Sequence, residues 1–326
     1  MAENRIEDFL RGDVFPRDPA ARDRARVRLW TAIRAEETGD RPTFRRRWRI
    51  VTVAAALAAL AILILQVALP PGGVGPTLGA AAEIRQLGRV AATQEPMSLR
   101  ASDFIYSRTR EVRREAITRL TEEIAFSLDI TATRQTWLAA DGSGQAVMQV
   151  EDVDFSSATD RDVWEAAGAP PIVADGDSDT EDYGRGELPV YAVENLPADP
   201  QALREALASG DVITPAEGDL NLLLTIGIVL GQQDLPGDVR QALFEVAATI
   251  QGITVEHDVS DLAGREAIAL TLVDASSTSR LFFDPVDAHF LGQSETFPSG
   301  GDRPAFTDWR VYLETALVDD IGDRPS

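Results

Sequence analysis

An uncharged apolar segment, Ile50 to Leu69, limits what this chain can fold into. It reads IVTVAAALAALAILILQVAL, twenty residues without a charge, of which eleven are Leu, Ile or Val. As a helix rising about 1.5 Å per residue it is roughly 30 Å long, which matches the hydrocarbon core of a bilayer. The sequence therefore predicts one transmembrane helix.

The residues directly before this segment predict its orientation. They form a basic membrane flank with one tryptophan: Arg45, Arg46, Arg47, Trp48 and Arg49. Basic residues favour the cytoplasmic side, and tryptophan favours the membrane interface. We therefore predict a single-pass protein of the plasma membrane with its N-terminus in the cytoplasm. A cleaved signal peptide is the alternative, but the apolar run starts at residue 50 and ends in Pro70 to Gly73 without a clear cleavage site.

Charge is distributed unevenly around the predicted span. The 49 residues before it carry 13 arginines and 9 acidic residues, a net charge of +4. The part after it carries 18 basic and 44 acidic residues, a net charge of −26. Such an acidic surface repels phosphates, so we expect no nucleic-acid partner. The chain has no Cys, which excludes disulfides and thiolate chemistry.

Four regions follow from this division. Residues 1–44 form a short cytoplasmic helical arm, in which Asp18 and Pro19 are typical of a helix start. Residues 45–70 are the basic flank and the span, and residues 71–100 are a Pro/Gly tether and a stalk helix. Residues 101–326 form the extracytoplasmic domain. The arm is either a solvated helix or a helix that docks on a cytoplasmic protein.

The start of the outer domain has the patterns of β-strands. Residues 103–113 alternate, with Phe104 and Tyr106 on one face. Residues 131–139 and 145–153 are β-rich and surround a DGSG turn, which is a strong hairpin signal. An acidic loop over residues 154–189 is expected next.

Helical and then strand patterns follow. Helices are predicted near residues 78–93, 199–209, 219–230 and 236–250, and strands over 253–259, 267–273, 280–283, 288–294 and 309–317. Short turns between the first four of these strands indicate an antiparallel meander. We therefore predict an α+β fold, in which a transmembrane helix precedes a curved, half-barrel-like antiparallel sheet covered by helices.

Two groups of side chains are candidates for ligand binding. An apolar ligand face would contain Phe104, Tyr106, Trp137 and Met148, although such residues are more often simply core. A weak metal candidate has acidic residues at the alternating positions of a calcium loop: Asp175, Asp177, Asp179 and Glu181. Thr180 and Gly186 depart from the calcium pattern, so a plain acidic insertion is the alternative and no metal is expected.

Histidine chemistry has little support in the sequence. The chain has two histidines, His257 and His289, each within a predicted strand. Glu256 and Asp258 flank His257, but adjacent strand residues point to opposite faces, and no nucleophile motif accompanies either histidine. We expect both to be structural, and we expect no enzyme activity and no cofactor.

Several segments resemble one family. They are YSRTREV (106–112), TWLAADGSGQ (136–145), LPADPQALREAL (196–207), ITVEHDVSDLAGREAIAL (253–270) and LFFDP (281–285). They resemble an uncharacterised family of actinobacterial single-pass membrane proteins with an Arg-rich arm. More distantly, the outer domain resembles the half-barrels of lipoprotein carriers and of envelope-stress regulators that act through an anti-sigma factor. The arm lacks the His and paired Cys of zinc-binding anti-sigma domains.

Together these features predict an envelope protein that binds or senses. Its expected partners are the lipid bilayer, an envelope protein or lipid ligand outside, and a cytoplasmic protein at the arm, to which the domain would relay a signal. The alternative is a membrane-tethered carrier or scaffold for lipids or lipoproteins, which needs an open apolar cavity.

Overall fold

The computed structural model describes residues 78–97, 99–100, 102–119, 124–185, 196–209, 218–231, 235–300 and 304–325. All of them belong to one compact unit, Gly75–Ser326. The predicted arm, the basic flank from Arg45 to Arg49 and the apolar segment Ile50 to Leu69 lie outside the described residues. Among the described helices, none combines the length and the apolar character needed to cross a bilayer.

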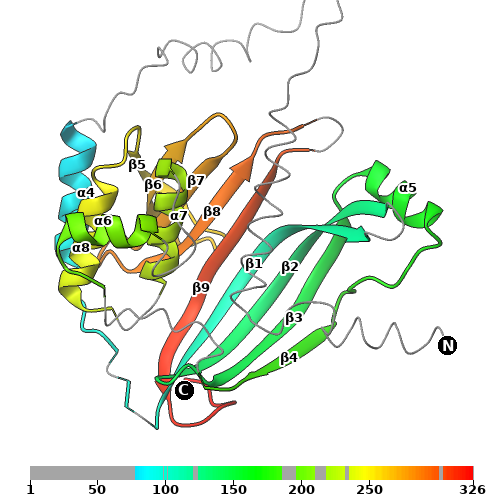
Figure 1. Cartoon of the computed structure of the whole chain (residues 1–326), viewed down its shortest axis with the longest axis horizontal. Helices are drawn as coiled ribbons and strands as arrows, with labels where there is room; N and C mark the ends of the chain where they lie inside the picture. Colours follow the sequence, from blue (N-terminus) through cyan, green and yellow to red (C-terminus); the bar gives the residue numbers. More distant parts are fainter. Residues whose placement is uncertain are drawn as a thin grey trace, which may run out of the picture. The chain divides into compact units, whose positions relative to one another are not determined.

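The described strands form one open antiparallel sheet of nine strands in the order β4-β3-β2-β1-β9-β8-β7-β6-β5 (Figure 1). Their bounds are β1 Phe104–Arg119, β2 Ile124–Ala139, β3 Gly144–Phe155, β4 Ser178–Tyr183, β5 Thr254–Ser260, β6 Glu266–Val273, β7 Thr278–Phe283, β8 Phe290–Phe297 and β9 Phe306–Val318. β4 and β5 are the two edges. The sheet thus consists of two meanders, β1 to β4 and β5 to β9, which the pairing of β1 with β9 joins.

Five helices are described, and they pack on the sheet in two places. Their bounds are α4 Leu78–Ala91, α5 Ala158–Ala166, α6 Pro200–Ser209, α7 Gly218–Leu230 and α8 Gly237–Ala247. α4, α6, α7 and α8 gather over the second meander, where α7 contacts β7 and β8 (Figure 1). α5 lies apart from them and packs on β2 and β3.

Local chemistry explains where several elements begin. The Asp199 carboxylate accepts a hydrogen bond from the Ala202 N–H at 2.9 Å, and Pro200 is the first residue of α6. In the DGSG turn, the Asp141 carboxylate accepts hydrogen bonds from the N–H and the hydroxyl of Ser143. Gly142 there has φ 78°, a conformation that glycine adopts without strain.

Most predicted elements are confirmed. The four helices predicted after residue 70 correspond to α4, α6, α7 and α8, and the predicted hairpin and later strands correspond to β2, β3 and β5 to β9. The prediction of a loop over residues 154–189 was wrong, because this stretch contains α5 and β4. Ser157 caps α5 by accepting a hydrogen bond from the Asp160 N–H, a short-range signal that the acidic composition obscured.

The main hydrophobic core lies between the helix group and β5 to β8. It contains Ile226 of α7, Leu243 of α8 and Leu281 of β7, all at most 1% exposed. The Phe244 and Phe283 rings pack at 5.0 Å between centroids, which fixes α8 against the sheet.

The buried Arg240 side chain joins α8 to the end of α4. Its guanidinium donates hydrogen bonds to the carbonyl oxygens of Ala91, the last residue of α4, of Gln94 just beyond it, and of Leu235. Carbonyl groups at a helix C-terminus have no partner within the helix, so the guanidinium satisfies them. Burial lowers the pKa of Arg240.

Close packing of α4 on α8 depends on Gly88. A Cβ atom added at Gly88 would lie 2.7 Å from the Phe244 Cβ. We therefore expect Gly88→Ala to destabilise the protein by about 1–2 kcal/mol, since overpacking outweighs the usual helical preference for alanine. Urea unfolding of the full-length protein, followed by tryptophan fluorescence, measures this.

Gly79→Ala in the same helix is the control. Gly79 is exposed near the start of α4. Alanine there should leave the free energy of unfolding unchanged or raise it by up to about 1 kcal/mol. If both substitutions stabilise the protein equally, Gly88 has no packing role.

Candidate functional site

One row of side chains crosses eight strands on a single face of the sheet. Directly paired residues of neighbouring strands point to the same face. The row is Val255, Leu270, Leu281, Gln293, Arg310, Glu111, Ala132 and Val150. Leu270 and Leu281 belong to the core under the helix group, and Ala132 and Val150 belong to a second core at α5. Both sets of helices therefore lie on this face, which we call the helix face.

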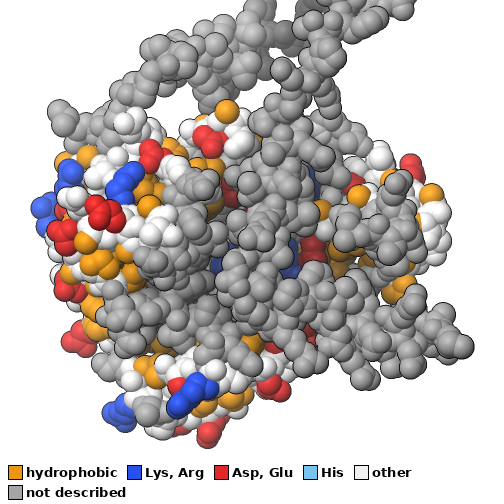
Figure 2. All heavy atoms as spheres, viewed as in Figure 1, with side chains coloured by type: hydrophobic (Ala, Val, Ile, Leu, Met, Phe, Trp, Pro, Cys, Tyr) orange, Lys and Arg blue, Asp and Glu red, His pale blue; other side chains and the backbone are white. Residues whose placement is uncertain are grey.

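The middle of the helix face differs from its two ends. Among the described residues, the helices make their main sheet contacts with β5, β7 and β8 on one side and β2 and β3 on the other, and no helix packs along β1 or β9. The row is polar there, with Arg310 on β9 and Glu111 on β1, and the neighbouring Gln293 on β8 lies beneath α7. Basic side chains are visible over these strands in Figure 2.

Glu111 lies at the centre of this polar region. Its carboxylate accepts a hydrogen bond from the Arg310 Nε at 2.9 Å and lies 3.7 Å from the Arg113 guanidinium. The side chain is 12% exposed. Burial alone would raise the pKa of Glu111, but the positive charges of Arg310, Arg134 and Arg113 outweigh it and lower the pKa. Glu111 is therefore ionised at neutral pH.

Arg113 and Arg134 extend this region toward the second core. Both terminal nitrogens of Arg113 lie 3.7 Å from the Met148 sulfur. Arg134 is the direct cross-strand neighbour of Met148, and its guanidinium donates to the Tyr183 hydroxyl at 3.4 Å. Tyr183 in turn donates to Glu181. Burial and this hydrogen bond raise the pKa of Tyr183 to about 12, so the phenol stays protonated.

The opposite face of the same strands also carries ion pairs. Arg114 forms a bidentate pair with Asp129 at 2.7 and 2.8 Å. Arg110 pairs with Glu151 at 2.9 Å, and Arg108 lies 3.4 Å from Glu314. The middle of the sheet is thus polar on both sides. No sequence pattern marks these arginines, because strand register alone brings each one to its partner.

The structure separates the four residues of the predicted apolar ligand face. Tyr106 and Trp137 are cross-strand partners on the opposite face, where they form a small cluster with Phe104 and Val318. Met148 lies on the helix face. Neighbouring side chains of a strand point to opposite faces, so Met148 cannot lie on the same face as Val147. Val147 is the residue that contacts the Tyr106 cluster.

The C-terminal residues extend over the Tyr106 cluster. The Trp137 indole donates a hydrogen bond to the carbonyl oxygen of Asp323 at 2.8 Å. The Arg324 charge acts on Tyr106, which is fully buried. In this structure the aromatic pair therefore belongs to a covered cluster.

The four acidic residues of the predicted calcium loop do not converge. The Asp175 carboxylate accepts from the Val153 N–H, and the Asp177 carboxylate accepts from the Ala174 N–H. Asp179 and Glu181 lie on β4. Within the described ranges no group of three or more His, Cys, Asp or Glu side chains is arranged to hold a metal ion.

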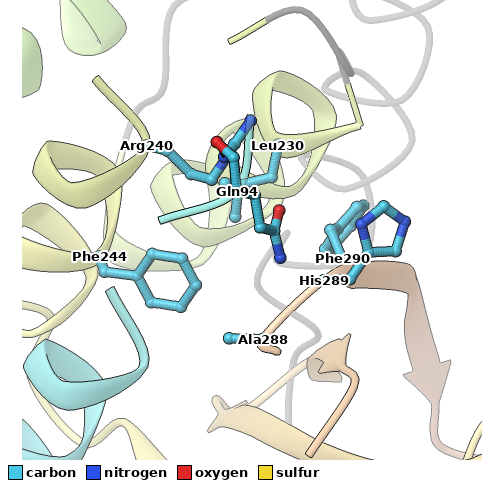
Figure 3. Close-up of a pocket in the computed structure, with 7 residues that line it drawn as sticks. All are labelled: Gln94, Leu230, Arg240, Phe244, Ala288, His289 and Phe290. Carbon is cyan, nitrogen blue, oxygen red and sulfur yellow. Dashed lines mark hydrogen bonds between the residues drawn. The ribbon is translucent and has the colours of Figure 1, made fainter. Parts of the chain in front are cut away.

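The two histidines make separate local contacts. His257 Nε2 lies 2.6 Å from the Glu83 carboxylate, which links β5 to α4. His289 borders a cavity of about 10 Å³ together with Gln94, Arg240 and Phe290 (Figure 3). A volume of this size holds one water molecule at most. Burial lowers the pKa of His289.

Comparison with known proteins adds no assignment. No protein-family model matches the chain, and no curated protein sequence matches it. The candidate site therefore depends on the geometry of the helix face alone.

The ionised Glu111 should stabilise the fold in a pH-dependent way. We expect Glu111→Gln to reduce the free energy of unfolding by about 1–3 kcal/mol at neutral pH, because the arginines around it lose their buried partner. A lowered pKa means that this contribution is present above the ordinary pKa of 4.5 and is lost as the pH falls through the folded-state value. Urea unfolding at neutral and acidic pH should therefore show a difference that shrinks with acid.

Glu151→Gln provides the matched control on the opposite face. Its partner Arg110 is 40% exposed. Exposed ion pairs contribute little, so we expect a loss below about 1 kcal/mol. Equal losses for the two variants would contradict the central role of Glu111.

Proposed function

We propose that the protein is a membrane-anchored, extracytoplasmic binding protein of the cell envelope, without a catalytic centre. In this proposal the outer domain recognises a ligand or an envelope protein on the middle of the helix face. The residues before the span would relay the bound state to a cytoplasmic partner.

The observation that carries the proposal is the polarity of the long row across the sheet. Its apolar ends lie under helices, and Gln293 on β8 still lies beneath α7, whereas Arg310 and Glu111 belong to β9 and β1, along which no described helix packs. A sheet face that carries charges and lies between two helix-covered ends has the form of a recognition surface.

The alternative, a carrier of lipids or lipoproteins, would need space for an acyl chain. The cavity in Figure 3 has a volume of about 10 Å³, and the Phe104, Tyr106 and Trp137 cluster is covered by C-terminal residues. We therefore favour recognition on the middle of the helix face over enclosure of a chain.

The anchor and the relay are the finer parts of the proposal. They follow from the uncharged segment Ile50 to Leu69 and from the change in net charge across it. The short arm is the candidate site for the cytoplasmic partner. Its deletion should abolish any signalling phenotype while leaving ligand binding outside intact.

Face-selective photo-crosslinking tests the recognition surface. Glu115 and Ala116 are adjacent, exposed residues of β1 that point to the helix face and to the opposite face, respectively. A photoreactive amino acid at position 115 of the full-length protein should capture a discrete protein or lipid partner in native membranes. The same group at position 116 should not, and mass spectrometry would identify the adducts. Identical adducts at both positions, or none at position 115, would contradict the proposal.

The absence of cysteine allows a clean test of orientation. A single Ala140→Cys substitution places a thiol in the exposed turn of the hairpin, and Thr38→Cys places one in the arm. A membrane-impermeant maleimide should label the first in intact cells and the second after permeabilisation. Labelling of Thr38→Cys in intact cells would reverse the predicted topology, and a mature chain without the arm would indicate a cleaved signal peptide.

A further inference from the structure

We propose that Arg134 and Arg113 form a binding site for a phosphate group on the helix face. The inference deepens the proposed function and rests on it, since it names the chemistry of the ligand that this face recognises. The phosphate could belong to a lipid headgroup or to free phosphate, and the experiment below separates these sources.

The first argument is that Arg134 lacks an acidic partner. Of the arginines on β1, β2 and β9 whose side chains the structure describes, Arg134 alone has no carboxylate oxygen within 4.0 Å. Its side chain is partly buried, and its one hydrogen-bond partner is the neutral Tyr183 hydroxyl. A partly buried guanidinium group without a directly paired carboxylate favours binding of an anion, and the Arg134 charge already acts on Glu111.

The second argument is the position of Arg113. Its contacts to Glu111 and Glu115 are long, at 3.7 and 3.4 Å. Both of its terminal nitrogens lie near the sulfur of Met148, which is directly beside Arg134 on the neighbouring strand. On β2, Ala132 lies between Arg134 and Ile130, the cross-strand neighbour of Arg113. Its side chain ends at Cβ and fills little of the space there. The Arg113 guanidinium and the Arg134 side chain, which belong to different strands, therefore both lie next to Met148.

This arrangement suits a tetrahedral oxyanion better than a carboxylate. One guanidinium fork matches the two coplanar oxygens of a carboxylate. Two forks from different directions can instead bind different oxygens of a phosphate, which also carries up to two negative charges. Glu111 already occupies the position of a carboxylate between Arg113 and Arg310.

Acidic side chains around the site limit what it accepts. Glu111, Glu115, Glu181 and Asp179 also lie on the helix face. The Tyr183 proton is donated to Glu181, and Glu115 is 46% exposed. These four carboxylates nearly balance the positive charges of Arg113, Arg134 and Arg310. This near balance favours a single phosphate group over an extended polyanion. Beyond Met148, the partly buried Ile117 and Phe155 of the second core provide an apolar surface for the rest of an amphiphile.

Calorimetry of the full-length protein in a phosphate-free maltoside detergent tests the site. The two probes are inorganic phosphate and a short-chain phosphatidylglycerol. We expect saturable binding of at least one of them, weakened at least tenfold by Arg134→Gln and by Arg113→Gln. Arg110→Gln, on the same strand but the opposite face, should leave the affinity unchanged. Glu111→Gln removes a competing carboxylate and should strengthen binding several-fold, a gain that misfolding cannot mimic.

Each result has a defined meaning. Binding of inorganic phosphate alone supports the site with a soluble source, and binding of phosphatidylglycerol alone supports it with a lipid source. No saturable binding of either probe, equal binding of acetate, or an equal loss in Arg110→Gln overturns the phosphate site. Captured partners at position 115 without phosphate binding would leave the proposed function standing while this inference fails.

Discussion

The pairing of β1 with β9 is the interaction on which the sheet depends. It joins residues 104–112 to residues 309–318, so strands about two hundred residues apart in the chain become neighbours. Without this pairing, the four-stranded first meander would retain the small core at α5 and the Tyr106 cluster without Val318, and the second would keep the main core. Closing so long a loop costs conformational entropy, which a long ladder of hydrogen bonds offsets.

An irregularity in this pairing determines which face each end of β9 supplies. Tyr312 pairs with Thr109 and Glu314 with Arg108, which leaves Leu313 as an extra residue. Such a bulge reverses the alternation of side chains along the strand. Arg310 and Tyr312 therefore lie on the helix face, whereas Val318 lies on the opposite face with Tyr106 and Trp137. One inserted residue thus gives β9 both a charged and an apolar role.

The sequence was sufficient to predict the helices and most strands, because their apolar periodicity is local. It was insufficient for α5 and β4, where acidic residues dominate and tertiary contacts decide the structure. Nor could it predict the extension of β1 to Arg119, since RREAITR lacks a clean alternation and is stabilised by pairing with residues 124–130. The four residues DGSG were enough to predict the hairpin turn. The order of strands in the sheet depends on the pairing of β1 with β9, which no local pattern predicts.

The candidate site could not be predicted from the sequence either, because it too depends on contacts between distant strands. Arg113 and Arg134 are two of 31 basic residues, and no spacing marks them. Their relation depends on register, which places Arg134 beside Thr109 and Met148 and sets Glu111 opposite Arg310. The Glu111–Arg310 ion pair also bridges β1 and β9, so the recognition surface and the junction of the two meanders share a residue. A phosphate held by Arg113 and Arg134 would compete with Glu111 for Arg113. Glu111 would then pair with Arg310 alone. Because a ligand that binds the folded state stabilises it, occupation of the helix face would also strengthen the junction that forms this face.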